Sequence, residues 1–530
     1  MSSQIVDASD VTLSGGTGLV VLDGVGFGVT DVVRLADGEA RPVPGTDAMK
    51  RATESWDAAR QIAATGRVYG RSTGVGANRN EAVPTEAAAE HGLRLLRSHA
   101  GAIGDELPAR EVRAMLAVRA NQLLAGGAGL RPTVVTALCE ALENGVYPVV
   151  NEFGSVGTGD IAALAQVGLA LVGEHPWRSV FGGPGLSGGP GLSGGPGLSG
   201  GPGLVGVPEP QPLDNNDALA MISSNALTLG QSALALHELR GLIGATQVVG
   251  ALSLLAVDGS HEPFAAPVHA ARPHRGSTEV ARRMRELIGA ADRPTPPLGR
   301  IQDPYGFRCL PQIHGPAHDA ADALEEVLAI EINAAAENPF ISAEDMTAYH
   351  HGGFYQAQLV LALDHFRLAL TQVARLSTSR LSSLNEPAFT RLKPFLADNE
   401  AASSGVMILE YAAAAALGDL RAFSAPASLG HAVLSRGVEE QASFASLAAR
   451  QTLRACRAYR LVVGCELVAA VRALRQRDLR PDPELPVGRA LELAESVLDD
   501  GTADRPLTDD VTAAAGLLDR FTDIWRGSTA

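Results

Sequence analysis

Residues 149–166 read Val-Val-Asn-Glu-Phe-Gly-Ser-Val-Gly-Thr-Gly-Asp-Ile-Ala-Ala-Leu-Ala-Gln. Three glycines fall within six of these residues: Gly154, Gly157 and Gly159. Glycines at this density permit backbone conformations that a side chain would forbid. Asp160 is a suitable N-cap for the buried helix that we expect over residues 160–174. The stretch therefore predicts a sharp turn at the start of a buried helix.

The composition is that of a helical globular protein. The chain has 530 residues, enough for more than one structural unit, and 46% of them are hydrophobic and 19% charged. Aromatic residues make up only 4%, and stretches rich in Ala, Leu and Arg favour helices. The net charge of −16 argues against nucleic acid as a partner, because phosphate binding requires a basic surface.

Lysine and cysteine usage limit the cofactors that the chain can hold. Only Lys50 and Lys393 can form the Schiff base that pyridoxal phosphate requires, and neither lies in a context that suggests a cofactor pocket. The four cysteines show no Cys-x-x-Cys spacing, so we expect reduced thiols, no pyridoxal phosphate and no metal. The N-terminus lacks a basic region followed by an apolar run, which predicts a cytoplasmic protein.

Two segments are unusual in composition. Residues 241–257 carry no charge, but a membrane span needs roughly 20 residues, and polar side chains interrupt this one. We expect a helix buried on all sides, and no contact with a membrane. Four successive copies of Gly-Gly-Pro-Gly-Leu-Ser, the fourth ending in valine, begin at Gly182. Gly and Pro at this density support neither a helix nor a strand ladder, so residues 180–210 should be a flexible surface loop.

The hydrophobic pattern predicts a mainly α protein with a bundle of long helices in the middle of the chain. Apolar residues recur at helical spacing in six segments: 216–257, 276–289, 316–337, 354–383, 402–418 and 437–477. Pro339 should end the third of these helices. The pattern divides the chain into an N-terminal part (1–210), a central long-helix bundle (211–477) and a helical C-terminal tail (478–530).

The opening stretch resembles a segment of the aromatic amino-acid ammonia-lyases, which comprise histidine, phenylalanine and tyrosine lyases and related aminomutases. The family's segment is Gly-Ser-Val-Gly-Ala-Ser-Gly-Asp, and residues 154–160 read Gly-Ser-Val-Gly-Thr-Gly-Asp. In the family, Ala-Ser-Gly cyclises and loses water to give an electrophilic methylidene-imidazolone (MIO). The resemblance implies an autocatalytic MIO-type group from Gly157, Thr158 and Gly159, in a lyase-like (fumarase/aspartase-like) helical architecture.

A second segment of the chain resembles the same family, in the same order along the sequence. Residues 69–76, Tyr-Gly-Arg-Ser-Thr-Gly-Val-Gly, are similar to the family's Tyr-Gly-x-x-Thr-Gly-Phe-Gly loop. The resemblance implies that Tyr69 is the catalytic base that removes the β-proton of the substrate. A phenol has an unperturbed pKa of ~10, so it needs electrostatic help to act near neutral pH.

A third segment implies how the substrate carboxylate is held. Residues 302–312, Gln-Asp-Pro-Tyr-Gly-Phe-Arg-Cys-Leu-Pro-Gln, match a family segment almost position for position. By that resemblance Tyr305 is a second phenol near the electrophile, and Arg308 pairs with the carboxylate, to which a guanidinium can donate two parallel hydrogen bonds. Asn338, in Glu-Asn-Pro-Phe, matches the family's Asp-Asn-Pro-Leu and would hold the same carboxylate.

Three residues bear on the side chain of the substrate. Ser98 and His99 lie where the family selects the substrate ring, and Ser-His at this place is similar to histidine lyases. Glu439 matches a position that is glutamate in histidine lyases and glutamine in phenylalanine lyases. A carboxylate can accept a hydrogen bond from an imidazole or pair with an ammonium group. A solvated helix face explains Glu439 nearly as well, so both interpretations stay open.

Three departures from the family fall near the expected reaction centre. Thr158 stands where serine is expected, in a segment one residue shorter, and a dehydrated threonine carries a methyl group that hinders the alkene. Ser223, a candidate substrate-binding residue, replaces an asparagine that contacts the electrophile. Asn225 comes two positions later, turned about 200° away on a helix (~100° per residue). The family's Gly-Asn-Phe-His is Gly-Gly-Phe-Tyr at residues 352–355.

Three hypotheses follow. The leading one is a carbon–nitrogen lyase: an ammonia-lyase that converts an aromatic or imidazole-bearing α-amino acid, with histidine-like substrates favoured, into an α,β-unsaturated acid through the MIO-type group. The second is an aminomutase or a lyase-like enzyme without that group, and the third is a non-catalytic binding or scaffold protein. The resemblance also implies a homotetramer whose active sites draw on several subunits.

Overall fold

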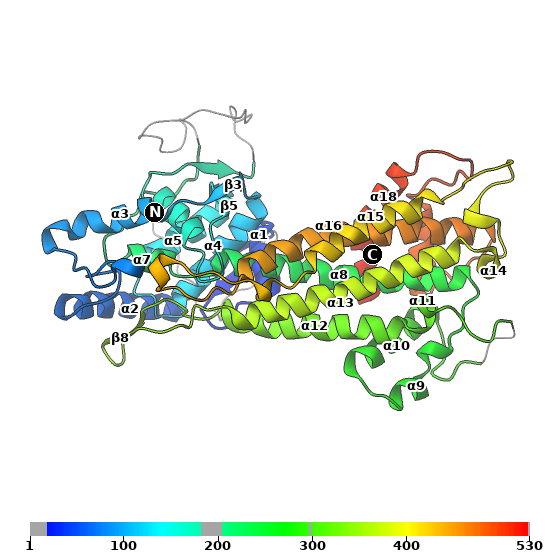
Figure 1. The fold of residues 1–530 in the computed structure, drawn as a ribbon, viewed down its shortest axis with the longest axis horizontal. Coiled ribbons are helices and arrows are strands. Elements are labelled where there is room, and N and C mark those ends of the chain that lie inside the picture. Colours follow the sequence, from blue (N-terminus) through cyan, green and yellow to red (C-terminus); the bar gives the residue numbers. More distant parts are fainter. Residues whose placement is uncertain (1–17, 182–203, 296–298, 528–530) are drawn as a thin grey trace. The chain divides into compact units, whose positions relative to one another are not determined.

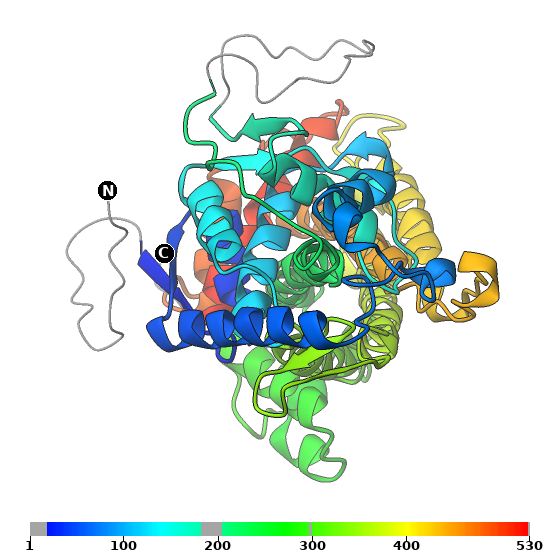
Figure 2. The same ribbon diagram turned by 90° about the vertical axis from the view of Figure 1, so that its left-hand side faces the viewer.

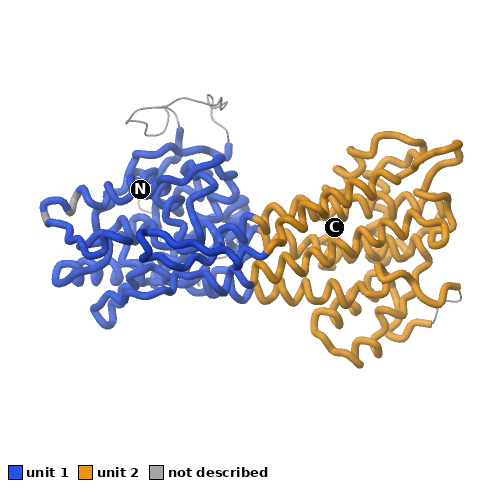
Figure 3. Tube along the Cα trace, viewed as in Figure 1, with its two compact units in different colours: residues 1–234, 325–361, 426–450 blue, residues 235–324, 362–425, 451–530 orange. Residues whose placement is uncertain are grey.

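The computed structural model describes residues 18–181, 204–295 and 299–527, and it is mostly helical, which confirms the predicted fold class. Figure 3 shows two compact units. Unit 1 comprises residues 1–234, 325–361 and 426–450, and unit 2 comprises residues 235–324, 362–425 and 451–530. Four long helices contribute residues to both units: α8 (Ala226–Ala256), α12 (Leu310–Glu331), α13 (Ala357–Leu384) and α16 (Ala445–Gln476).

Unit 1 contains short strands as well as helices. Its other α-helices are α1 (Val29–Ala36), α2 (Thr46–Thr65), α3 (Ala88–His99), α4 (Ala109–Leu124), α5 (Thr133–Glu143), α6 (Ile161–Leu171) and α7 (Ala218–Ile222). Strands β1 (Gly18–Leu22) and β2 (Ala40–Pro44) pair in parallel. Three further pairs are antiparallel: β3 (Ile103–Glu106) with β5 (Asn151–Phe153), β4 (Val146–Pro148) with β6 (Trp177–Ser179), and β7 (Phe340–Ser342) with β8 (Thr347–Tyr349).

The core of unit 1 forms around α4, which is buried along almost its whole length. Its buried Arg113 donates hydrogen bonds of 2.8–3.0 Å to the carbonyl oxygens of Leu35, Ala36 and Leu142. These carbonyls lie in the last turns of α1 and α5, where backbone donors are few, so one guanidinium adds hydrogen bonds at two helix ends. Figure 2 faces unit 1 and shows the dark blue α2 beside the β7–β8 hairpin, where Ala59 and Ile341 are buried together.

Unit 2 is built from helices alone among its described residues. In addition to its parts of the four long helices, it contains α9 (Ala266–Ala270), α10 (Arg275–Ile288), α11 (Tyr305–Arg308), α14 (Pro387–Thr390), α15 (Ile408–Phe423), α17 (Pro486–Glu495) and α18 (Thr508–Arg526). Helices α8, α13 and α16 run alongside one another (Figure 1). The fully buried carboxylate of Glu466 on α16 joins them, because it accepts hydrogen bonds from Arg380 on α13 and Ser253 on α8.

Several predicted helix bounds are wrong. The helix predicted over 216–257 is interrupted between Ile222 and Ala226, and the one predicted over 316–337 runs from Leu310 to Glu331 with Pro316 inside it. Pro339 therefore follows a non-helical segment. The helix predicted over 437–477 begins only at Ala445. In each case, the residues that were predicted to be helical but are not belong to loops. The polar groups of these loops form hydrogen bonds elsewhere in the fold.

Two segments singled out by composition have different outcomes. The part of the predicted loop that holds the Gly-Gly-Pro-Gly-Leu-Ser copies, residues 182–203, lies outside the described residues. Residues 241–257 lie mostly within α8 and are buried nearly throughout, as expected. Among the described residues, the stretch Ala218–Ala256 is long and apolar enough to cross a membrane, and 89% of its most apolar window is buried inside the protein.

Candidate active site

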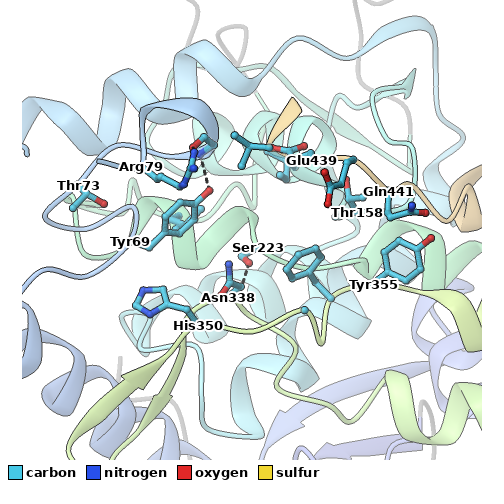
Figure 4. A pocket seen from close by; sticks show the side chains of 18 of the residues that line it. Tyr69, Thr73, Arg79, Thr158, Ser223, Asn338, His350, Tyr355, Glu439 and Gln441 are labelled. Atoms are coloured by element: carbon cyan, nitrogen blue, oxygen red, sulfur yellow. Dashed lines mark hydrogen bonds between the residues drawn. The ribbon is translucent and has the colours of Figure 1, made fainter. Parts of the chain in front are cut away.

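A cavity of about 870 Å³ lies in unit 1, and Figure 4 shows the side chains around it. Its walls come from residues 67–80, the turn at 158–161, the end of α7, both flanks of the β7–β8 hairpin and residues 438–441. The fold brings six of the predicted site residues together here: Tyr69, Thr158, Gly159, Ser223, Asn338 and Glu439. Segments far apart in the sequence therefore meet at one place.

Tyr69 precedes the short 3-10 helix η1 (Gly76–Asn78). The backbone N–H of Gly76 donates a 2.7 Å hydrogen bond to the Tyr69 phenol oxygen, and the His350 ring lies edge-on at 6.4 Å between centroids. Burial raises the pKa of Tyr69. The Gly76 N–H lowers it, the carboxylate of Glu439 raises it, and the guanidinium of Arg79 lowers it. The loop therefore supplies two groups that stabilise the phenolate against the effect of burial.

Serine hydroxyls hold the turn at residues 155–159. Ser155 accepts a hydrogen bond from the Gly157 N–H (3.1 Å) and donates one to the Gly159 carbonyl (3.0 Å). The Gly157 carbonyl accepts a 2.7 Å hydrogen bond from the hydroxyl of Ser443. Gly157 has φ of +87°, and a Cβ on it would lie 2.2 Å from Ser443 Oγ. Position 157 thus requires glycine for its backbone conformation and for space.

Asp160 occupies the N-cap position of α6, as predicted, but its side chain makes no capping hydrogen bond to that helix. Its buried carboxylate accepts hydrogen bonds from the backbone N–H (2.8 Å) and the hydroxyl (2.9 Å) of Thr228, in the first turn of α8. The Asp160 N–H donates to the carbonyl of Ser224 at 2.7 Å. A carboxylate is stabilised at a helix N-terminus, and here the neighbouring helix supplies that environment. Asp160 therefore fixes the turn to the start of α8.

Ser223 and Asn338 lie next to each other in the cavity (Figure 4). The Asn338 N–H donates to Ser223 Oγ at 3.1 Å, and Asn338 Oδ1 accepts a 3.0 Å hydrogen bond from the His351 N–H. Within the described part of the chain, Asn338 Nδ2 donates to no group. Two amide hydrogens therefore remain to bind an anionic group such as a carboxylate.

Five predicted site residues do not line the cavity: Gly157, which lies in the turn behind Thr158, and four residues on α3 and α11. Tyr305 and Arg308 form the ends of α11 in unit 2, where the Arg308 guanidinium carbon lies 4.8 Å from the centroid of the Tyr305 ring. Ser98 and His99 lie at the end of α3, and both side chains contact the Leu95 carbonyl oxygen, at 3.0 and 2.9 Å. The contacts of Ser98 and His99 are therefore with a carbonyl oxygen in the last turn of α3.

The predictions missed several polar and aromatic lining residues: Arg67, Arg79, Asn80, His350, Tyr355, Glu440 and Gln441. Arg67 and Arg79 flank the Tyr69 loop, and His350 and Tyr355 flank two glycines, so their nearness to the recognised motifs was the only signal in the sequence. With Glu439 and Glu440 on the same cavity, these arginines give the site charges of both signs. Such a cavity suits a zwitterionic ligand.

The residues at 157–159 fit an MIO-type group in three respects. Ring closure needs the Gly159 nitrogen to attack the Gly157 carbonyl carbon, and the Gly159 N–H donates to no group among the described residues. That carbonyl is already hydrogen-bonded by Ser443. Thr158 lines the cavity, so the alkene would face a ligand.

Among the described residues no cluster of His, Cys, Asp or Glu could hold a metal ion.

The helical turn expected between Ser223 and Asn225 is absent, because residues 223–225 lie between α7 and α8. Asn225 is buried, with 1% of its surface exposed, and its Nδ2 donates a 2.9 Å hydrogen bond to the Phe354 carbonyl. It is not among the residues that line the cavity, whereas Ser223 is. An amide that would contact the electrophile from this side is therefore replaced by a hydroxyl.

Comparisons with known proteins show which proteins this chain is similar to. The model of the family described as aromatic amino acid lyase matches residues 27–496. A histidine ammonia-lyase of Geobacillus kaustophilus is 33% identical over 470 residues, which cover 86% of this chain and 89% of that protein. The Treponema denticola ergothionase, solved with desmethyl-ergothioneine sulfonic acid, has a TM-score of 0.85 at 25% identity, covering 96% and 99% of the two chains. Tyrosine aminomutase from Streptomyces globisporus has a TM-score of 0.85 at 25% identity, covering 96% and 98%.

Proposed function

This chain belongs to the aromatic amino acid lyase family, and from that premise we propose that it is an ammonia-lyase for a histidine-like α-amino acid. The observation that carries the proposal is that one cavity is lined by the phenol of Tyr69, by Thr158 of the glycine-rich turn and by the side-chain amide of Asn338. The similarity to a histidine ammonia-lyase supports the substrate class. Glu439 supports it too, because its carboxylate lines the cavity and can accept a hydrogen bond from an imidazole N–H.

Each lining residue has a distinct role in the proposed elimination. Asn338 Nδ2 donates to the substrate carboxylate, while Tyr69 accepts the β-proton with its phenolate stabilised by the Gly76 N–H. The MIO-type group formed from residues 157–159 would supply an electron-poor alkene that makes the amino nitrogen a better leaving group. Glu439 orients the substrate ring. Proton removal and loss of ammonia then leave an α,β-unsaturated acid.

Tyr305 and Arg308 have the chemistry for this site but lie in unit 2, outside the lining of the cavity. We propose that they reach the site from another copy of the chain, in a cytoplasmic homotetramer. The 70% exposure of Tyr305 in one chain supports this, because a large aromatic side chain is more often covered. In the assembled enzyme Arg308 would pair with the carboxylate that Asn338 also holds.

Intact mass and turnover measured on the same purified protein test the proposal. We expect a mass lower by two waters than that of the sequence and a near-ultraviolet band that borohydride removes. Ammonia release should be fastest with histidine among histidine, phenylalanine and tyrosine. Thr158→Ala is the control, since it retains the backbone but cannot form the alkene. An unmodified mass, or faster release from phenylalanine than from histidine, would contradict the proposal in its cofactor or in its substrate.

A lyase-like enzyme without the MIO-type group is the second candidate. The location of Asn225 favours it, because the amide that the family places against the electrophile here donates to Phe354 instead. An unmodified mass together with ammonia release would identify this candidate. Conversion to a β-amino acid would identify an aminomutase, and ligand binding without turnover a non-catalytic binding protein.

A further inference from the structure

The hydroxyl of Ser443 lies against the carbonyl group at which the ring would close. Ser443 is two residues before α16, and only 3% of its surface is exposed. Its Oγ accepts the Ala445 N–H at 3.3 Å and donates to the Gly157 carbonyl oxygen at 2.7 Å. The Ala445 N–H donates to a lone pair of the Ser443 oxygen, so the single hydrogen of the Ser443 hydroxyl is directed at the Gly157 carbonyl.

The segment around Ser443 holds the turn at three successive carbonyl groups. The Phe444 N–H donates to the Val156 carbonyl at 2.8 Å, and Ser446 Oγ donates to the Ser155 carbonyl at 2.9 Å. Together with the contact at Gly157, these bonds fix the carbonyl side of the turn. The attacking nitrogen stays free, since the Gly159 N–H has no acceptor among the described residues.

We propose that Ser443 is the hydrogen-bond donor that activates the Gly157 carbonyl for ring closure. This inference rests on the proposed function, because it concerns how the MIO-type group is made. An N–H or O–H aimed at an oxygen that gains negative charge lowers the barrier of acyl chemistry most when it is buried and already in position. Ser443 meets both conditions.

The step balances without an oxidant or a reductant. The lone pair of the Gly159 nitrogen forms a bond to the Gly157 carbonyl carbon, and the π pair moves to the oxygen, where Ser443 stabilises the charge. That oxygen takes a proton while the Gly159 nitrogen loses its own to water in the cavity. The oxygen leaves as water with the hydrogen of the Thr158 nitrogen, and a second water forms from the Thr158 hydroxyl and its α-hydrogen.

The test follows maturation in freshly synthesised full-length protein, by intact mass over time. Ser443→Ala should slow the loss of water about a hundredfold, the usual effect of removing one donor to an oxyanion. Ser446→Ala is the matched control: it removes a serine hydroxyl from the same segment, but its partner is the Ser155 carbonyl, which does not react. This variant should mature at a rate close to that of the unaltered protein.

The outcomes separate the inference from the proposed function. If the unaltered protein never loses water, the MIO-type group is absent, and both the MIO-based elimination and this inference fail. If the unaltered protein matures and a folded Ser443→Ala matures equally fast, only the inference is overturned. Should Ser443→Ala fail to fold, Ser443→Cys decides, because a thiol at the same place is a weaker donor. Slower maturation supports the proposal, and an unchanged rate overturns it.

Discussion

Gly157 explains at the scale of one residue why the turn departs from the family's Ala-Ser-Gly. Its positive φ and the 2.2 Å approach of Ser443 Oγ leave no place for a side chain. The density of glycines in the sequence predicted a turn of this kind. The sequence could not indicate Ser443, because nothing local links residues 286 positions apart.

Gly157→Ala should therefore destabilise the protein and block maturation. The left-handed backbone alone costs about 1–2 kcal/mol for a residue with a Cβ, and the clash with Ser443 adds to it. Gly418→Ala on α15 is the control, because a Cβ there meets nothing within 4 Å, and the change should stabilise the helix slightly. Denaturant unfolding and intact mass measure both effects, and similar unfolding midpoints for the two variants would contradict this account of Gly157.

Tyr69 should make the activity rise with pH. Burial raises its pKa above the ordinary value of 10.0, and the base must be deprotonated to act. Because the deprotonated fraction of Tyr69 increases with pH, kcat/KM should rise about tenfold per pH unit from neutral pH upward. Arg79→Gln removes a charge that lowers this pKa and should move the profile to higher pH. Glu439→Gln removes a charge that raises it and should move the profile to lower pH. Two shifts in the same direction would argue against Tyr69 as the base.

Tyr69→Phe should remove catalysis but leave binding intact. The change deletes one oxygen, whose only hydrogen bond among the described residues comes from the Gly76 N–H on an accessible loop. Loss of a general base lowers kcat by about 10²–10⁴-fold. Steady-state kinetics and calorimetric titration with histidine measure the two effects. Turnover within a few-fold of that of the unaltered protein would assign the base to another group.

Helices were predicted where apolar residues recur over several turns, and their bounds failed where polar groups find distant partners. Residues 437–444 continue the helical pattern in the sequence, yet residues 438–441 line the cavity, and Ser443 and Phe444 donate hydrogen bonds to the glycine turn. The interruption before α8 has a similar cause, because Ser223 and Ser224 bond to Asn338 and Gln122. Local bonding of this kind competes with a helix, and periodicity alone does not detect it.

The free energy of unfolding should depend on pH through His318 on α12. Its ring stacks on Trp525 and lies 2.7 Å from Gln247, and burial lowers the pKa of His318 to about 4. The unfolded chain binds a proton below about pH 6.5, which the folded protein does not bind until about pH 4. The stabilisation is thus complete above pH 6.5 and is lost as pH falls to 4, by roughly 2–3 kcal/mol for this partly exposed ring.

The matching measurement is denaturant unfolding at several pH values. His318→Gln should flatten the decrease in unfolding free energy between pH 6.5 and 4. His365→Gln, on the exposed face of α13, is the control and should leave the decrease unchanged. An equally steep decrease in His318→Gln would show that other groups cause it.

On the scale of the whole molecule, composition and motifs divide the chain into consecutive parts, whereas each compact unit combines three separated stretches. The reason is that α8, α12, α13 and α16 each contribute residues to both units. Sequence motifs identified six of the residues that line the cavity, including Tyr69 and Asn338. They could not indicate which of these groups share a cavity within one chain, because that depends on the fold and the assembly.

Mixed oligomers test whether the site is shared. Tyr69→Phe and Arg308→Gln should each be nearly inactive alone. If the two residues act in one site but come from different copies, co-expression of both variants should restore activity, to about a quarter of that of the unaltered enzyme for random mixing. Mixing the two variants after each has been purified separately is the control and should restore nothing, provided that the proposed oligomers do not exchange subunits. No recovery on co-expression would place both residues in the same copy.

The contact between Ser443 and the glycine turn also determines when in the life of the molecule the reactive group can arise. A ribosome has made more than four fifths of the chain before residue 443 exists, and that residue must still leave the exit tunnel. A polypeptide that ends before residue 443 would therefore be slow to convert its tripeptide into an alkene that cellular thiols could attack. The order of synthesis therefore delays rapid formation of the electrophile until most of the chain has been made.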